Sequence, residues 1–121
     1  MHYVSTRGKA PEVGFADALL AGLAPDGGLY VPGEWPTAPS VAGPGYADTA
    51  VAVMWPYVEG SIGRADFEAI VAEAYATFRH PDVVPITELA DGIHQAELFW
   101  GPTLAFKDVA LQLVGRLFDH E

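Results

Sequence analysis

The organisation of this chain is decided by one stretch, Gly101-Pro102-Thr103-Leu104-Ala105-Phe106-Lys107-Asp108-Val109-Ala110-Leu111-Gln112. Gly101-Pro102-Thr103 breaks a strand that the sequence predicts over Ile93 to Trp100. After this break, apolar residues recur at helical spacing. They are Val109, Ala110, Leu113, Val114, Leu117 and Phe118. The polar residues between them are expected to face water, namely Asp108, Gln112, Arg116 and Asp119. The stretch therefore predicts strand, turn and helix in direct succession.

Three more helices are predicted upstream. The first is expected from about Gly14 to Leu23 and the second from Tyr46 to Val58. One side of the second is expected to carry Tyr46, Ala50, Val53, Met54 and Tyr57. The third has the most regular apolar pattern and is expected to end at His80-Pro81-Asp82. Its apolar positions are Phe67, Ile70, Val71, Ala74, Tyr75 and Phe78.

Turn residues separate these helices from short strands. Pro25-Asp26-Gly27-Gly28 predicts a turn before a brief strand at Leu29-Tyr30-Val31. The proline- and glycine-rich residues from Pro32 to Gly45 predict a loop. Residues 83–89 are expected to be extended or loop, and Asp91-Gly92 predicts another turn. Together with the helices, this pattern predicts an α+β (partial α/β) fold.

Composition excludes several classes of function. The net charge of −10 argues against a nucleic-acid partner, because binding a phosphate backbone needs clustered Lys and Arg. The absence of cysteine excludes disulfides, and no histidine pair has the spacing of metal ligands. No stretch approaches the ~20 apolar residues of a membrane span, and the amino terminus lacks the pattern of a secretory signal. We expect a cytoplasmic protein without a metal site.

Lys107 is the candidate for chemistry. The pattern places it at the first turn of the last helix, directly after Leu104-Ala105-Phe106. The positive end of the helix dipole and the apolar neighbours both favour the neutral amine, which is the form that attacks an aldehyde. The more common role of such a lysine, judged from these residues alone, is to extend its ammonium to solvent and pair with Asp108. Asp108 itself is explained as a helix-start anion and Thr103 as the cap before it.

The stretch from Gly101 to Gln112 resembles the lysine motif of the threonine synthase family, which belongs to the fold type II pyridoxal-phosphate enzymes. Tyr3 to Gly8 resembles the opening of that family, and Ala18 to Pro32 resembles its first helix, turn and strand. The three blocks occur in the order of the family and at about its spacing, so the resemblance covers the whole chain.

The resemblance implies a cofactor, pyridoxal 5'-phosphate, and roles for two residues. Lys107 matches the lysine that bonds to the cofactor and then moves protons, and Phe106 matches a residue that packs against the cofactor ring. The implied reaction is that of a lyase in threonine biosynthesis, the conversion of O-phospho-L-homoserine and water to L-threonine and phosphate. The implied partner is this small-molecule substrate.

The resemblance also implies that more chain belongs with these residues. Residues 1–92 match an amino-terminal subdomain and residues 93–121 the start of the catalytic domain, whereas the family places a Gly/Ser/Thr-rich phosphate loop further on. We therefore expect an incomplete and inactive fragment, which is an excised piece, a truncated product or one part of a split protein. A homo-oligomer or the missing catalytic body is expected to contact it.

Two other functions stay open. In the first, the chain is a non-catalytic docking or dimerisation module whose partner surface is the apolar face of Leu113, Val114 and Leu117. In the second, it belongs to a threonine-synthase-like phospholyase that acts on another phosphorylated amino compound. The residues that select the substrate are not identified by any motif in this chain.

Overall fold

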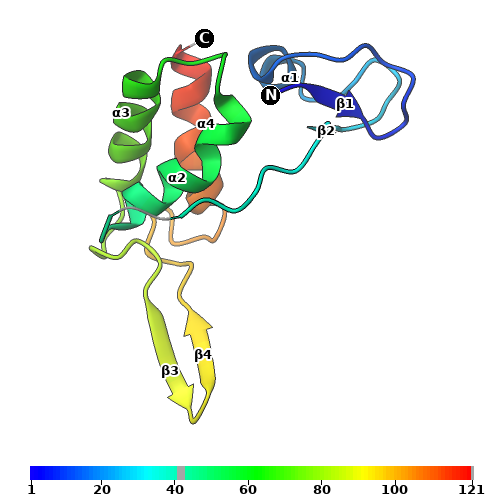
Figure 1. The fold of residues 1–121 in the computed structure, drawn as a ribbon. Coiled ribbons are helices and arrows are strands. Elements are labelled where there is room, and N and C mark those ends of the chain that lie inside the picture. The colour runs from blue at the N-terminus through cyan, green and yellow to red at the C-terminus, as the bar shows by residue number, and fades with distance from the viewer. Residues whose placement is uncertain (41–42, 121) are drawn as a thin grey trace.

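The computed structural model describes residues 1–40 and 43–120, and there the chain has four helices and two separate two-stranded antiparallel sheets. Helices α2 (Tyr46–Val58), α3 (Arg64–Tyr75) and α4 (Asp108–His120) lie side by side. An amino-terminal unit lies to one side of them, and a hairpin extends away from them (Figure 1). The predicted α+β class is confirmed. No helix in these described ranges is long and apolar enough to cross a membrane.

The amino-terminal unit consists of β1 (Tyr3–Ser5), α1 (Phe15–Ala21) and β2 (Tyr30–Pro32), with the two strands paired antiparallel. The carboxylate of Asp26 holds its turn, since it accepts hydrogen bonds from Ser5 Oγ at 2.7 Å and from the backbone N–H of Gly28 at 2.9 Å. This fixes the turn directly against β1. The predicted first helix and the strand after it are therefore confirmed to within two residues.

The predicted loop from Pro32 to Gly45 is irregular after β2 wherever it is described, and residues 41 and 42 lie outside the described residues. Helix α2 then begins and ends where it was predicted. One residue of its predicted apolar side, Val53, is instead 45% exposed, while Val51 and Val58 are buried. The reason is that the shared core of α2, α3 and α4 contacts the side of α2 that carries Val51 and Val58.

The core lies on the predicted face of α3. Phe67 and Val71 are fully buried there, and Leu113 and Leu117 of α4 join the same cluster. This helix ends at Tyr75, so the prediction that it continues to His80-Pro81-Asp82 is wrong. The chain turns earlier because the backbone N–H of Phe78 bonds to the carbonyl of Tyr75, and the Thr77 hydroxyl bonds to Ala74.

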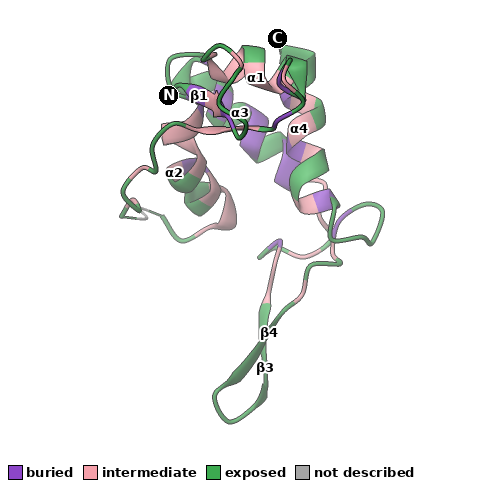
Figure 2. Cartoon of the chain, turned by 90° about the vertical axis from the view of Figure 1, so that its right-hand side faces the viewer, coloured by how far each residue is buried: buried purple, intermediate pink, exposed green. Residues whose placement is uncertain are grey.

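The hairpin consists of β3 (Ile86–Ala90) and β4 (Ile93–Ala96), joined at Asp91-Gly92 as predicted. Every residue of both strands is exposed (Figure 2). The strand predicted to reach Trp100 ends at Ala96. It ends there because the Glu97 carboxylate accepts hydrogen bonds from Thr87 Oγ1 at 2.7 Å and from Trp100 Nε1 at 2.8 Å. These bonds fold residues 97–100 back as a turn.

Candidate active site around Lys107

Lys107 lies in the turn that directly precedes α4. Its carbonyl accepts the backbone N–H groups of Ala110 at 3.1 Å and Leu111 at 2.8 Å, so it opens the hydrogen-bond pattern of the helix. The prediction that it belongs to the first turn of the helix is thus wrong by one residue. Its side chain is exposed to solvent. An accessible amine therefore stands at the positive end of a thirteen-residue helix.

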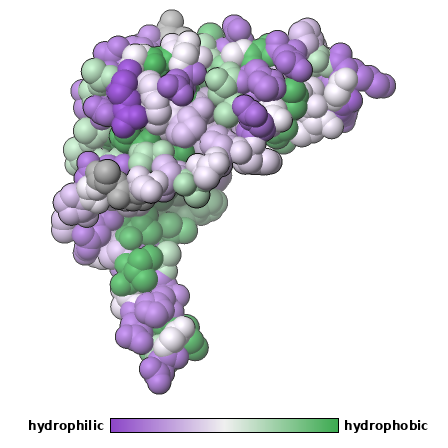
Figure 3. Space-filling view, in the orientation of Figure 1, coloured by the Kyte–Doolittle hydropathy of each residue, from purple (hydrophilic) through white to green (hydrophobic). Residues whose placement is uncertain are grey.

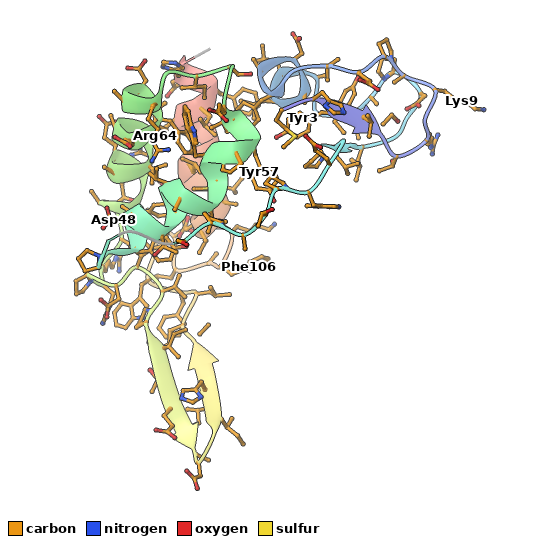
Figure 4. The ribbon with its side chains drawn as sticks, viewed as in Figure 1. Tyr3, Lys9, Asp48, Tyr57, Arg64 and Phe106 are labelled. Atoms are coloured by element: carbon orange, nitrogen blue, oxygen red, sulfur yellow. The ribbon has the colours of Figure 1, made fainter. Side chains whose placement is uncertain are left out.

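An open apolar hollow of about 590 Å³ adjoins this amine. Its lining residues are Leu98, Phe106, Lys107, Val109, Ala110 and Leu111. Phe106 is 66% exposed, and it lies at the end of the helical layer nearest the hairpin, far from Lys9 of the amino-terminal unit (Figure 4). In the space-filling view, hydrophobic residues gather between the helices and the hydrophilic tip of the hairpin (Figure 3). The apolar surroundings predicted for Lys107 are present, although its side chain is not enclosed by them.

Asp108 is buried, with 2% of its surface exposed, so the prediction that it faces water is wrong. Its Oδ2 accepts hydrogen bonds from the backbone N–H of Thr103 at 2.8 Å and from Thr103 Oγ1 at 2.9 Å. Its Oδ1 accepts a bond from Gln112 Nε2 at 3.3 Å. Burial acts to raise the pKa of Asp108, but the hydrogen bonds from Thr103, Gln112 and the Ala105 backbone outweigh it and lower that pKa.

These bonds correct two expectations about this aspartate. Thr103 donates to Asp108 rather than accepting helix N–H groups, so it is not the cap of α4. The suggested pairing of Lys107 with Asp108 is also absent, because the ion pairs of the described ranges are Arg64–Glu68 and His80–Asp82. The Asp108 carboxylate is bonded to the preceding loop and does not pair with the Lys107 amine.

The loop from Gly101 to Lys107 is anchored at its start as well. The backbone N–H of Arg79 donates to the carbonyl of Trp100 at 2.9 Å, and Arg79 Nη2 reaches the carbonyl of Pro102 at 3.3 Å. Within the loop, Leu104 has a φ of +62°, in the left-handed region that costs a non-glycine residue about 1 kcal/mol or more. Contacts from outside the loop thus hold a conformation that its own sequence disfavours.

Tyr75 connects α3 to the start of α4. Its hydroxyl donates to the carbonyl of Val109 at 3.1 Å, and its ring forms a T-shaped pair with Tyr46, with the centroids 4.8 Å apart. Burial, followed by the neighbouring Tyr46, raises the pKa of Tyr75 to about 12. The hydroxyl therefore remains a hydrogen-bond donor throughout the neutral range.

Sequence reasoning identified Lys107 and Phe106 as neighbours but missed Tyr75, Arg79 and Asp108 as the residues that hold their loop. The signal that could have identified Asp108 is an acidic residue at the first position of a strongly apolar helix, five residues after a threonine. Tyr75 and Arg79 had no such signal, since both contact segments more than twenty residues away. In the described ranges, no three acidic or histidine side chains converge as metal ligands would.

A family model described as "Threonine synthase N terminus" matches residues 2–75, which is more than half of the chain. The chain belongs to the threonine synthase family. Lys107 lies beyond the residues that this model matches, and the longer comparisons with individual proteins include it.

Threonine synthase from Pseudomonas aeruginosa is 54% identical over 99% of this chain, and that of Schizosaccharomyces pombe is 43% identical over 97%. Threonine synthase-like 2 of Xenopus laevis is 39% identical over 99% of the chain. The chain spans 27%, 24% and 27% of these three relatives, which is about a quarter of their length.

Solved structures agree with these sequence comparisons. A PLP-bound threonine synthase from Brucella melitensis has a TM-score of 0.94 and 54% identity, covering 99% of this chain and 27% of that one. The threonine synthase from yeast has a TM-score of 0.85 and 40% identity, covering 98% and 26%. The fold described above, hairpin included, is thus shared with proteins about four times as long.

Proposed function

We propose that this chain supplies the lysine segment of a pyridoxal-phosphate-dependent threonine synthase, which converts O-phospho-L-homoserine and water to L-threonine and phosphate. The observation that carries the proposal is the exposed amine of Lys107 at the start of α4, directly beside an aromatic residue and an apolar hollow. In this proposal Lys107 is the catalytic residue and Phe106 a cofactor-binding residue.

The residues around Lys107 suit the cofactor. An aldehyde needs an accessible primary amine, and Lys107 presents one. The face of a pyridine ring suits an aromatic and aliphatic lining, and Phe106, Leu98 and Val109 provide it. Lys107 is the one charged residue in this lining, so partners for the cofactor phosphate come from elsewhere in the proposed enzyme. When bound, pyridoxal phosphate supplies an electron sink for the substrate carbons.

The chemical work of the chain itself falls to one side chain. Lys107 Nζ would hold the cofactor until the substrate amine replaces it, and would then move a proton between Cα and Cβ of the substrate. Its long, rotatable stem allows one amine to reach two adjacent carbons. Phe106 would keep water from one face of this site. The anchored loop before α4 would limit where the stem of Lys107 begins.

Further proposals concern the surroundings of this segment. The division into residues 1–92 and 93–121, with the second range opening the catalytic domain, is proposed from the resemblance of the lysine motif. We propose that the exposed hairpin and the apolar hollows contact the rest of the catalytic domain. A cytoplasmic location and a lyase activity are proposed from the biosynthetic reaction.

The two other functions keep specific support. Tyr46, Met54, Leu113 and Val114 help to line a second apolar hollow of about 490 Å³, which suits a docking module. The relatives named threonine synthase-like 2 suit a phospholyase with another substrate. Phosphate release distinguishes the three functions. A threonine synthase releases phosphate from O-phospho-L-homoserine, a phospholyase releases it from another phosphorylated amino compound, and a docking module releases none.

The decisive experiment is a hybrid of the Brucella melitensis enzyme in which this chain replaces the segment it matches. We expect the hybrid to bind pyridoxal phosphate and to release phosphate from O-phospho-L-homoserine. Lys107→Ala should abolish phosphate release and the covalent attachment of the cofactor, whereas Lys9→Ala, which removes the other lysine of this chain, should change neither. A folded hybrid whose phosphate release survives Lys107→Ala would exclude the proposed role.

A further inference from the structure

Asp108, which directly follows Lys107, is the one buried carboxylate of the described residues, and the chemistry proposed above does not use it. We propose that Asp108 is a positioning residue, whose carboxylate closes the loop from Gly101 to Ala105 and thereby fixes the Lys107 amine at the edge of the apolar hollow. This inference rests on the proposed function, since it assigns Lys107 as the group to be positioned.

The contacts of the carboxylate support this role. Its Oδ2 takes both donors of Thr103, at 2.8 and 2.9 Å, and its Oδ1 takes Gln112 Nε2 at 3.3 Å. Thr103 lies in the middle of the loop and Gln112 lies one turn into α4. The side chain of Asp108 thus links the loop to the helix through hydrogen bonds, in addition to the covalent link of the backbone.

The start of the loop also closes on Asp108. A Cβ built on Gly101 would clash with both the Cβ and the Oδ2 of Asp108, so only glycine fits there. The loop therefore returns to its starting point within eight residues. Such a closed loop accounts for the left-handed Leu104, whose backbone cost must be offset by contacts that the loop makes elsewhere.

Asp108 and Lys107 are adjacent and have opposite exposure, because the carboxylate is buried and the amine is exposed. The backbone between them has little freedom, since the carbonyl of Lys107 is already bonded to Ala110 and Leu111. Anchoring Asp108 inward therefore sends the stem of Lys107 outward, toward the hollow that Phe106 and Val109 line. The effect is geometric rather than a charge contact, because the carboxylate faces Thr103 and Gln112.

Lys9 and Lys107 are the two lysines of the chain, so Lys9 is an internal control for the test. The chain is incubated with pyridoxal phosphate and reduced with borohydride, and the labelled peptides are quantified by mass spectrometry. The measurement is the ratio of label on Lys107 to label on Lys9. The same chain in urea supplies the ratio for an unpositioned lysine. Circular dichroism and urea titration of each variant show whether it is folded.

Four variants separate geometry from charge and from stability. Asp108→Ala removes the acceptor and Thr103→Val removes one donor at constant shape. Asp108→Asn keeps an oxygen that can take both Thr103 donors, whereas Asp108→Glu keeps the charge but moves the carboxylate by one methylene from the position that bonds Thr103. We expect the folded parent chain to prefer Lys107 and Asp108→Asn to retain most of this preference. In Asp108→Ala and Asp108→Glu the labelling ratio should drop to the value measured in urea. In Thr103→Val the ratio should lie between that value and the parent ratio.

Three results would overturn the inference. One is a folded Asp108→Ala chain that keeps the parent ratio while its urea midpoint falls, since the role is then stability alone. Another is a preference kept by Asp108→Glu and lost by Asp108→Asn, since the role is then electrostatic. The third is a folded parent chain without preference for Lys107. The proposed function is decided separately by phosphate release from the hybrid, so the two can fail independently.

Discussion

The hydroxyl of Tyr75 donates a hydrogen bond to the backbone carbonyl of Val109, 3.1 Å away, and so connects the end of α3 to the start of α4. Val109 lies two residues after Lys107 and also lines the hollow beside it. The same tyrosine is part of the core cluster with Phe67 and Leu113. The position of the candidate catalytic lysine is therefore coupled to the packing of a helix more than thirty residues earlier.

Removing this hydroxyl tests the coupling. Tyr75→Phe keeps the ring in the core but loses the bond to Val109, which should lower the free energy of unfolding by about 1 kcal/mol. Urea unfolding followed by circular dichroism measures the change. Tyr30→Phe is the matched control, because its hydroxyl reaches Pro11 only at 3.5 Å on the exposed surface. Equal effects of the two substitutions would show that the bond to Val109 contributes nothing particular.

The same tyrosine predicts how stability changes at high pH. Burial raises the pKa of Tyr75 from 10.0 to about 12, so the folded chain retains a proton that the unfolded chain loses. The stabilising contribution is complete below pH 10 and is lost as the pH rises toward about 12. We expect the urea midpoint to fall over this interval, and to fall less steeply in Tyr75→Phe. A parallel decline in both chains would contradict the prediction.

Gly101 and Gly115 differ in the space available for an added methyl group. Gly101→Ala places a methyl group against the Asp108 side chain and should destabilise the loop before α4, exposing the amide of Thr103 to hydrogen exchange. Gly115 lies within α4 and has open space where a Cβ would stand, so Gly115→Ala should raise stability by about 1 kcal/mol through helix propensity. Hydrogen exchange and urea unfolding measure the pair. Faster exchange at Thr103 in both variants would argue against the contact with Asp108.

Phe67 and Phe106 differ strongly in burial. Phe67 is fully buried between the helices, so Phe67→Ala should cost about 3–5 kcal/mol in the free energy of unfolding. Phe106 is 66% exposed, and Phe106→Ala should leave stability nearly unchanged while weakening the labelling of Lys107 by pyridoxal phosphate. Denaturant titration and labelling by mass spectrometry separate the two effects. A large loss of stability in Phe106→Ala would place this ring in the core instead.

The spacing of apolar residues and the turn residue types correctly predicted the elements that are encoded by neighbouring residues. The bounds of α2 and the buried face of α3 follow directly from apolar spacing, and the turns at Asp26 and at Asp91-Gly92 follow from their residue types. Predictions that depended on contacts were less accurate. The strand after Ile93 is shorter than predicted because Glu97 bonds to Thr87 and Trp100, and apolar pattern carries no information about such side-chain bonds.

The sequence by itself determined the four helices, the hairpin turn, the family resemblance and the choice of Lys107, since each is encoded by residues close together in the chain. Only the tertiary structure decided that Asp108 is buried, that Val53 is exposed, and that Tyr75 and Arg79 hold the segment around Lys107. The physical reason is that burial and long-range hydrogen bonds depend on which faces meet after the helices pack. Asp108 is an example, because its place in the helical pattern predicted contact with water and the packed structure buries it against the preceding loop.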